Sequence, residues 1–493
     1  MDDTRTDAGD LAEYGYRQEL RRTLSTWAVF AIGFATISPV VGIYAVVQLG
    51  FVFAGPAWIW AVVAAFLGQS LVAVVYAELS SQFPITGGVY QWVRRLGGPR
   101  LGWLVGWIYL ASAVASLTTV AYLGASWLHM LVGDGTPSAA THVLLGVVFV
   151  AVALGINLLG VDPVKHFLNA GILAEGIASI AVSVVLLIFM RHNGFGILFE
   201  TLGAEAVSGG SAAAGFLTCL AVAGWAFLGF DATTQVAEET EQPRRSVPRA
   251  LLRAYLFVAF TVLLTGLAVT LALRRPEDAV SGATVDPVFA AVTDGLGGWS
   301  EKPFIVVVLI AFLACAISIQ TYIGRAVYAF ARDRQLPFSA TLATVGPRRI
   351  PYASLIATAV LAGLGLLLGL NGNAAATLIA FGSGGFYFVF LGVAVVALVA
   401  RTSGRWNPSA GRLRLGRPGL AINVLAVVWL LFEAVNIAWP RVELAPVGGS
   451  WVQVWAVVLV FSVLFAIGLV YVAIAEPHTK LPRNTTTEEV KAS

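Results

Sequence analysis

The sequence predicts an all-α membrane protein with twelve transmembrane helices. Hydrophobic side chains make up 58% of its 493 residues and charged side chains only 12%, a balance outside the range of soluble globular domains. Mostly apolar stretches of about 18 or more residues recur along the chain, and each is long enough to cross about 30 Å of hydrocarbon as a helix. This composition excludes a disulfide scaffold, a coiled coil, a disordered protein and a nucleic-acid-binding protein.

The apolar stretches follow one another along the whole chain. In order they cover residues 27–49, 57–79, 101–130, 142–160, 167–190, 215–236, 251–273, 304–331, 353–370, 375–400, 420–439 and 452–475. The 26 residues before the first stretch are polar and charged, which predicts a retained first helix rather than a cleaved signal sequence. Both cysteines, Cys219 and Cys315, lie inside apolar stretches, and we interpret them as small membrane-buried residues.

Basic residues are distributed unevenly between the two sides that alternating spans define. With a cytoplasmic N-terminus, 25 of the 30 Lys and Arg residues fall on the cytoplasmic side. The five on the other side are Arg191, Arg274, Arg275, Lys302 and Arg441. Because Lys and Arg resist translocation, this asymmetry predicts the orientation and supports twelve spans. Residues 1–26 and 476–493 are then cytoplasmic tails.

The first and the sixth predicted spans contain helix-breaking residues in mid-membrane. The first has Pro39 and Gly42, and the sixth has Gly224, Gly229 and Asp231. Pro lacks an amide donor, and discontinuous helices at matching places of two halves are typical of transporters with inverted repeats. The alternative is that these residues only kink two continuous helices.

Three stretches carry a resemblance to a known family: one after the second span, one after the sixth and one at the end of the eighth. They are YAEL at 76–79 with FPITGGVY at 83–90; GFD at 229–231 with AEE at 237–239 and PRRSVPRA at 243–250; and RAVYAFARD at 325–333 with LP at 336–337. Together, and in this order, they resemble the amino acid–polyamine–organocation transporter superfamily across all twelve spans.

The resemblance implies a five-plus-five inverted repeat with discontinuous helices 1 and 6, its halves at 27–190 and 215–400, and two further helices within 401–475. The first break of this family usually has two glycines, so that bare amide groups can approach a substrate carboxylate. This chain has Val40-Val41-Gly42 there, directly after Pro39, and so offers fewer donors. The pattern fits the amino acid/choline/GABA branch better than the arginine or cationic amino acid exchangers.

The two breaks and their neighbours form the candidate substrate site. Its residues are Ser38, Val40, Val41, Gly42, Tyr44, Trp225, Ala226, Phe227, Leu228, Asp231 and Ile319. Trp225 is the strongest candidate, because it matches a tryptophan that contacts the substrate in related exchangers, and a ring face attracts an ammonium group. For most other aromatic residues, the alternative is ordinary packing or anchoring at the membrane interface.

Two acidic residues inside predicted spans are candidates for proton coupling, since an unpaired charge in hydrocarbon is costly. Glu175 lies in the fifth span, where many proton-coupled members of the family have a lysine; its alternative is a neutral, hydrogen-bonded role between helices. Asp231 is a candidate protonation switch or counter-ion of a substrate amine. Its alternative is to cap the second half of the sixth span, with Thr234 three residues on.

Other polar residues suggest a gate and, more weakly, a sodium site. Glu78 and Glu238, near the cytoplasmic ends of the second and sixth spans, are predicted to pair with nearby arginines and to hold a gate together with Phe230. Ser318 in the eighth span is the candidate sodium ligand, with Thr321 one turn later. The alternative for these hydroxyls is a bond to the backbone of their own helix.

The predicted function is secondary active import of an amino acid or a related small amine by alternating access, with proton symport. Transport of choline, ethanolamine or a polyamine, amino acid exchange, a channel and a membrane receptor remain alternatives. The sequence has no phosphate-binding loop for ATP, and its five histidines are scattered without metal spacing. We therefore expect no cofactor, no metal and no enzymatic activity.

The expected partners are the small-molecule substrate, protons and the lipid bilayer, without nucleic acid. The expected location is the plasma membrane, with many spans and both termini in the cytoplasm. The abundance of Arg, Ala, Val and Gly is typical of a GC-rich bacterial genome, which suggests a bacterial source. The particular substrate, the direction of transport and the oligomeric state do not follow from the sequence.

Overall fold

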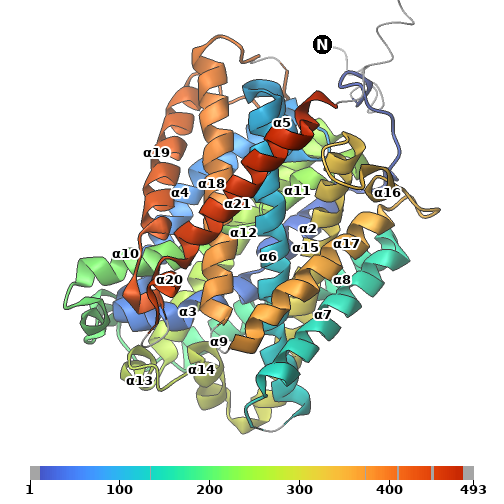
Figure 1. The fold of residues 1–493 in the computed structure, drawn as a ribbon. Helices are drawn as coiled ribbons and strands as arrows, with labels where there is room; N and C mark the ends of the chain where they lie inside the picture. Colours follow the sequence, from blue (N-terminus) through green and yellow to red (C-terminus); the bar gives the residue numbers. More distant parts are fainter. Residues whose placement is uncertain (1–10, 134, 372–373, 408–409, 446–448, 481–493) are drawn as a thin grey trace, which may run out of the picture.

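The computed structural model describes residues 11–133, 135–371, 374–407, 410–445 and 449–480, and it is helical almost throughout (Figure 1). The described residues form no β-strand, and Leu24 and Thr240 make an isolated parallel bridge. The predicted all-α membrane fold is confirmed.

The α-helices run from the N-terminal to the C-terminal part of the chain as labelled in Figure 1. They are α2 (Thr26–Ile37), α3 (Pro39–Ala54), α4 (Trp58–Gln82), α5 (Gly88–Gly97), α6 (Pro99–Val132), α7 (Ala139–Leu159), α8 (Val161–Glu175), α9 (Val182–Phe189), α10 (Ala212–Ala223), α11 (Ala232–Gln235), α12 (Pro243–Ala272), α13 (Pro276–Val280), α14 (Pro287–Leu296), α15 (Glu301–Arg332), α16 (Ser339–Leu342), α17 (Tyr352–Leu366), α18 (Ala374–Thr402), α19 (Pro418–Ala438), α20 (Trp451–Val454) and α21 (Ala456–Ala475).

Among the described residues, eleven helical stretches are long and apolar enough to cross a membrane. The first, Thr26–Gln82, has 57 residues, which as a helix would measure about 85 Å, more than twice the hydrocarbon thickness. It turns at the short 3₁₀ segment Gly55–Ala57 and therefore contains the first two predicted spans. With this stretch counted as two, the structure agrees with the twelve spans expected from the sequence.

Helices 1 and 6 are both discontinuous, as predicted. Helix 1 consists of α2 and α3, separated at Ser38, whose φ of 46° is outside the helical region. Pro39 begins α3, because its missing amide hydrogen costs nothing at the first position of a helix. Helix 6 consists of α10, the 3₁₀ turn η5 (Gly224–Phe227) and α11, with Gly229 at φ 97° between the last two.

The fifth predicted span is also irregular, which the sequence did not indicate. It begins as α8, continues through a π-helical segment at Gly176–Ala181 and ends as α9. Such π segments occur mostly inside α-helices and often at functional sites. Glu175 lies directly before this one.

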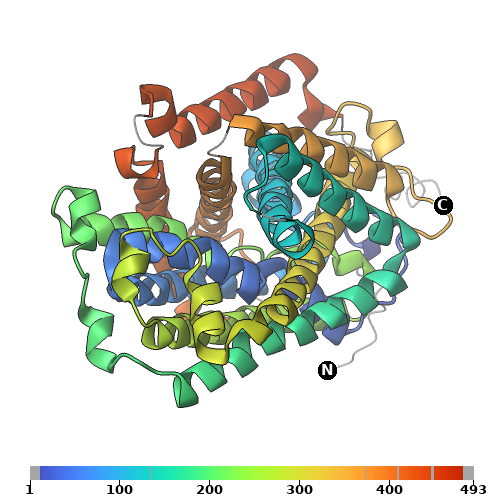
Figure 2. The same cartoon turned by 90° about the horizontal axis from the view of Figure 1, so that it is seen from below.

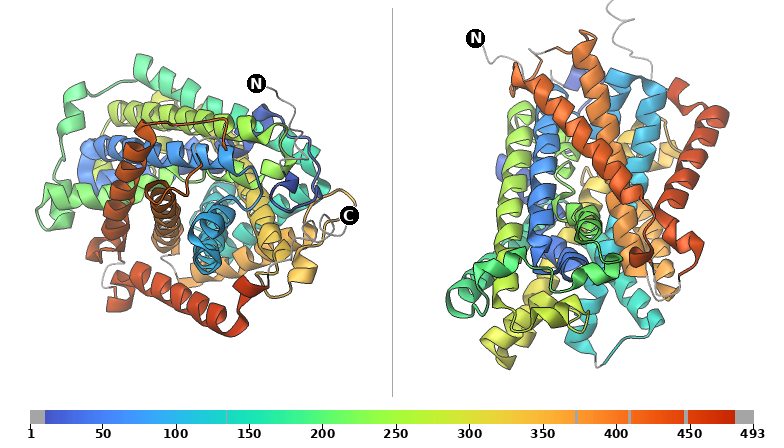
Figure 3. Two further views of the ribbon diagram at one scale, coloured as in Figure 1. Left: turned by 90° about the horizontal axis from the view of Figure 1, so that it is seen from above. Right: turned by 90° about the vertical axis from the view of Figure 1, so that its left-hand side faces the viewer.

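Viewed along its long axis, the bundle has α6 and α18 in its interior and α19 and α21 at its periphery (Figures 2 and 3). The long helix α6 packs against α15, α18 and α7, while α19 packs mainly against α18 and α4. Helix 1 is enclosed by α12, α15, α8 and α10. The two discontinuous helices therefore meet inside the protein, where α3 contacts η5.

The two ends of the bundle carry different elements. One end, the tail face, carries residues 11–24, α5 and α16, at the top of Figure 1. The other end, the opposite face, carries α13, α14 and α20. The sequence predicts that the tail face is cytoplasmic.

Candidate functional site

A small cavity lies where the breaks of helices 1 and 6 meet helices α6, α15 and α18. It is lined by Thr36, Ile37, Val41, Ser116, Val120, Trp225, Leu228, Gly229, Cys315, Ile319, Tyr322 and Phe386. Its volume is about 20 Å³, enough for about one water molecule. A substrate of amino acid size fits only if the surrounding helices move apart.

Glycines allow the two broken helices to touch at this cavity. A Cβ atom on Gly42 would lie 3.0 Å from the Ala226 Cα, so the backbones of helices 1 and 6 are in direct contact there. A Cβ atom on Gly229 would lie 2.8 Å from the Thr36 Cγ2, and its φ of 97° favours glycine. Both close approaches depend on the missing side chain.

Four of the predicted substrate-site residues line the cavity: Val41, Trp225, Leu228 and Ile319. Trp225 is almost fully buried, and its ring packs against Gly382 of α18. A large aromatic side chain therefore lines the cavity at the two helix breaks.

The remaining residues of the first break shape the backbone around the cavity without lining it. The Ser38 hydroxyl accepts a hydrogen bond from the Val41 amide at 3.2 Å, and so caps α3. The Val40 amide points to Glu175, and Ala226 packs against Gly42.

Two predicted wall residues lie away from the cavity. Tyr44 packs against Trp127, with ring centroids 5.0 Å apart, and Phe227 packs against Phe66 and Tyr255. The sequence did not indicate these directions, because they depend on which neighbouring helix each turn of a broken helix faces.

Asp231 is buried directly beyond the helix 6 break. Its Oδ2 accepts a hydrogen bond of 2.6 Å from the Tyr109 hydroxyl, and Oδ1 has no partner among the described residues. The alternative role as a side-chain cap of α11 is wrong, because the Asp231 carboxylate forms no cap hydrogen bond. The Thr234 hydroxyl bonds instead to the Asp231 carbonyl at 2.7 Å.

Glu175 lies at the other break. Its side chain is fully buried, and Oε2 is 3.5 Å from the amide nitrogen of Val40, at the N-terminal end of α3. The other oxygen, Oε1, has no partner in the described part of the chain. A carboxylate is favoured at this end of a helix, where free amide groups and the helix dipole present positive charge.

The candidate sodium ligands on α15 are already bonded. The Ser318 hydroxyl donates to the Ile32 carbonyl at 2.8 Å and lies 2.7 Å from the Thr36 hydroxyl. Thr321 donates to the Asn157 side chain at 2.7 Å. These hydroxyls link α15 to helix 1 and to α7 through hydrogen bonds within the protein.

Two buried ion pairs lie on the tail-face side of the cavity. Arg332 donates two hydrogen bonds to Glu238, at 2.8 and 2.9 Å, and the Thr86 amide adds a third at 3.1 Å. Glu78 forms an ion pair with Arg401. The pairing of both glutamates with arginines is thus present as the sequence suggested.

Aromatic packing lies between the cavity and these ion pairs. Phe230 packs against Tyr76, Tyr255 and Phe390. A third ion pair, which the sequence did not single out, joins Arg325 to Glu239 at 2.7 Å with both side chains buried.

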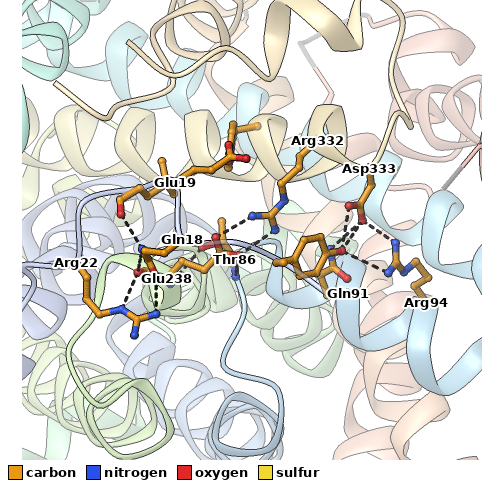
Figure 4. Close-up of polar contacts among 12 residues, drawn as sticks. Gln18, Glu19, Arg22, Thr86, Gln91, Arg94, Glu238, Arg332 and Asp333 are labelled. Atoms are coloured by element: carbon orange, nitrogen blue, oxygen red, sulfur yellow. Dashed lines mark hydrogen bonds and ion pairs between the residues drawn. The ribbon is translucent and has the colours of Figure 1, made fainter. Parts of the chain in front are cut away.

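The N-terminal segment 11–24 covers this region, and Figure 4 shows how its side chains enter the same network. Gln18 donates to the Glu238 carbonyl at 2.9 Å, and the Arg332 guanidinium lies 4.0 Å from the centre of the Tyr16 ring. The main chain of the segment also contacts this region, because the Leu24 amide donates to the Glu239 carbonyl at 2.8 Å.

Asp333 is a second anchor of the tail face that the sequence did not reveal (Figure 4). It is fully buried and accepts hydrogen bonds from Tyr16, Tyr90, Gln91 and Arg94 at 2.6 to 3.0 Å. Burial, reinforced by this carboxylate, raises the pKa of the Tyr16 and Tyr90 hydroxyls. Both hydroxyls therefore stay protonated and act as donors.

Several residues around the cavity were missed because they come from spans without any break. Tyr109, Ser116, Val120, Tyr322 and Phe386 lie in regular parts of α6, α15 and α18. Four of them are polar or aromatic residues in an apolar stretch, which does not show that they face a break far along the chain, and Val120 gives no signal in the sequence.

Comparison with known proteins identifies a matching family. A family model described as amino acid permease matches residues 24–464. The rice (Oryza sativa subsp. japonica) protein "Amino-acid permease BAT1 homolog" is 26% identical to this chain, with 87% of each chain covered.

Further relatives come from fungi. "Amino-acid permease 2" of Neurospora crassa is 26% identical over 93% of this chain and 87% of its own length. The "Choline transporter" of Saccharomyces cerevisiae is 24% identical over 86% of this chain and 77% of its own length. These relatives are from plants and fungi and give no support to a bacterial source.

Proposed function

This chain belongs to the amino acid permease family, and on that premise we propose that it imports an amino acid or a related small amine by alternating access. The protein is a multi-pass membrane transporter. The observation that carries the proposal is the buried cavity between two broken helices, with two buried ion pairs on its tail-face side.

The contacts around the cavity suggest how access alternates. Towards the tail face, a substrate path is blocked by the aromatic packing at Phe230 and by the Glu238–Arg332 pair. Opening this side requires that the ion pair and the contacts of segment 11–24 separate, while the opposite side closes. We infer that Glu78, Phe230 and Glu238 belong to this gate.

We propose that the substrate carries a positively charged amine. Trp225 lines the cavity, and Asp231 provides a buried carboxylate oxygen without a partner in the described chain. An ammonium group is attracted by both. The amide groups of helix 1 are less available to a substrate carboxylate, because Glu175 and Ser38 already accept hydrogen bonds from Val40 and Val41.

We propose that protons drive import, with Glu175 and Asp231 as the proton-binding residues. Each is buried at a helix break and has one oxygen without a partner among the described residues. Sodium coupling has less support, because Ser318 and Thr36 are satisfied by each other and by the Ile32 carbonyl.

We further propose a plasma membrane location with the tail face in the cytoplasm.

A second candidate is transport of choline or a similar quaternary amine. It is favoured by the fungal relative named choline transporter and by the aromatic face of Trp225, since such faces recognise quaternary ammonium groups. Under this alternative, Trp225 would be essential and a substrate carboxylate would be unnecessary.

Uptake into proteoliposomes containing the purified protein tests both candidates. The panel comprises radiolabelled neutral and cationic amino acids, choline, GABA, ethanolamine and putrescine, and liposomes without protein are the control. Saturable accumulation of an amino acid supports the first proposal, and accumulation of choline alone supports the second. Electrical currents that grow without saturation would indicate a channel and contradict both.

A further inference from the structure

A group of buried polar side chains lies outside the cavity, between α4, α18 and α19. Glu433 of α19, Gln69 of α4 and Tyr387 of α18 are each fully buried. Tyr387 is a neighbour of Gln69 and is within electrostatic range of the Glu433 carboxyl group. Within hydrogen-bonding distance, neither oxygen of Glu433 has a donor in the described part of the chain, and the polar atoms of Gln69 and Tyr387 have no partner there either. Buried polar atoms that remain unsatisfied need a physical explanation.

The surroundings of Glu433 provide no cation that neutralises it. The helices α4, α10, α18 and α21 pack against α19. Their titratable side chains are Tyr76, Glu78, Cys219, Tyr387, Arg401 and Tyr471, and of these Glu78 and Arg401 pair with each other.

Arg441, three residues after the end of α19, is the cation near Glu433. Its guanidinium group donates to the backbone carbonyl and the side chain of Asn436, both at 2.5 Å, rather than to Glu433. Asn436 in turn donates its own amide to the Leu217 carbonyl at 3.0 Å. An ionised Glu433 would therefore be a buried carboxylate without a direct ion pair, with the Asn436 side-chain amide as its neighbouring donor, which is unfavourable in the membrane.

Tyr387 connects this carboxyl group to the break of helix 6. A Cβ atom placed on Gly224 would overlap the Tyr387 hydroxyl oxygen, so the hydroxyl rests directly on the backbone where η5 begins. The next residue, Trp225, lines the cavity. A movement of the Tyr387 hydroxyl would thus change its contact with η5, the turn next to the candidate substrate site.

A groove connects the same group to the opposite face. It has a volume of about 790 Å³ and is lined by residues of α10 and by the end of α19 with the segment after it. Most of its lining is apolar, and its polar residues are Thr218, Asn436, Arg441 and Glu443. Asn436 is one turn beyond Glu433 on α19, so polar side chains lead from the groove to the buried carboxyl group.

We propose that Glu433 is a proton-binding site that exchanges its proton through this groove, and that Tyr387 transmits its occupancy to helix 6. With the proton bound, the neutral carboxylic acid can donate to Gln69 or Tyr387. When the proton leaves to water in the groove, the carboxylate needs a donor, and the Tyr387 hydroxyl must turn towards it and away from Gly224. The site is additional to Glu175 and Asp231, and only its effect on transport rests on the proposed function.

Infrared difference spectroscopy of the purified protein in lipid nanodiscs tests the proton site without any substrate. Changing the pH should produce a carboxylic acid carbonyl band that shifts in heavy water. We expect Glu433→Gln to remove one such band and the matched control Glu443→Gln to keep it, since Glu443 lies in the groove. Unchanged spectra in Glu433→Gln, or a Glu433 band that does not respond to pH, would overturn the proposal.

Tyr387→Phe gives an independent test if Glu433→Gln does not fold. Without the hydroxyl, the ionised form of Glu433 loses the donor that the proposal assigns to it, so the midpoint at which the band appears should shift to higher pH. An unchanged midpoint would exclude transmission through Tyr387. Because these measurements need no transport, a failed uptake assay would contradict the proposed function and leave the proton site standing.

Discussion

At the scale of single residues, the candidate site depends on two glycines without side chains and on two buried carboxyl groups that are only partly hydrogen-bonded. Gly42 and Gly229 allow close backbone contact between the two broken helices, and Asp231 and Glu175 each leave one oxygen free of partners in the described chain. Buried polar groups of this kind are costly for stability, so their presence at two helix breaks supports a functional role.

Replacing the glycines tests the position of the site. Gly42→Leu and Gly229→Leu should each abolish uptake while the protein still reaches the membrane, because the added side chain would meet Ala226 or Thr36 within 3.0 Å. Gly363→Leu on α17 is the matched control, since a Cβ atom there has no neighbour within 4 Å. Uptake at the wild-type rate in both site variants, measured in proteoliposomes, would rule out this site.

Asp231→Asn tests the recognition of the substrate amine. Loss of the carboxylate charge should weaken binding of an amine without a carboxylate by about 1–3 kcal/mol, or roughly five- to 150-fold in Kd. Binding is measured by thermal shift of the purified variants with the substrate found in the panel. The control is Tyr109→Phe, which keeps the charge and removes the 2.6 Å hydrogen bond to it, together with the 3.2 Å hydrogen bond from Gln235 to the Tyr109 hydroxyl. Equal affinity in wild type and Asp231→Asn would remove Asp231 from the binding site.

At the scale of secondary-structure elements, we expect measurable effects of pH on α14 and of truncation on segment 11–24. On the opposite face, α14 begins after Asp286, whose side chain accepts a hydrogen bond of 2.8 Å from the Phe289 amide. Burial raises the pKa of Asp286 to about 6. On the tail face, segment 11–24 is held by side-chain contacts to α5, α15 and the residues after α11.

The raised pKa of Asp286 predicts a pH-dependent contribution to stability. The folded protein binds this proton more tightly than the unfolded chain, whose Asp pKa is about 3.9, so the contribution is complete below that value and is lost as the pH rises through about 6. Asp286→Asn retains a capping side chain and does not titrate. Its Tm should therefore equal that of wild type near pH 4 and exceed it increasingly towards pH 7. A constant difference over this range would show that the carboxyl group does not titrate there.

Removing segment 11–24 tests its role in closing the tail face. Truncation before Thr23 eliminates the contacts of Tyr16 and Gln18 with Asp333 and Glu238, so amide hydrogens of α5 and of residues 83–87 should exchange faster in the purified protein. Truncation before Leu11 is the control and should leave exchange unchanged. Identical exchange in the two truncated proteins would show that the segment does not stabilise the closed tail face.

The sequence predicts the elements better than their mutual orientation. Pro39, Gly42 and Gly229 mark both broken helices, because these residues act on their own backbone. The bond between Tyr109 and Asp231 was not predictable, since it joins residues 122 positions apart through the packing of α6 against helix 6. For the same reason Phe227 was expected at the cavity and lies against Phe66 instead.

At the scale of the whole molecule, the described structure is closed on the tail face and has almost no free volume at the helix breaks. In the proposed mechanism, substrate binding expands the cavity, and release separates the Glu238 and Glu78 ion pairs. Breaking a buried ion pair costs about 3–5 kcal/mol, a barrier that the energy of substrate and proton binding has to offset.

Proton coupling predicts the direction of accumulation. With the tail face inside the proteoliposomes, an inwardly directed proton gradient should drive uptake above equilibrium, and a protonophore should abolish this accumulation. Glu175→Gln should keep exchange of substrate across the membrane but lose its dependence on the gradient, because the residue no longer exchanges a proton. Uptake that requires sodium and ignores the pH gradient would show that the coupling proposal is wrong.

The small volume between the helix breaks bears on the leakage of ions through the membrane. A cavity of about 20 Å³ offers no continuous column of water from one side of the membrane to the other. In the proposed mechanism, the protein without substrate should pass no current, so many copies can be present in a membrane without discharging its ion gradients. Current should flow only when substrate is present, and the number of protons imported should be proportional to the amount of substrate carried.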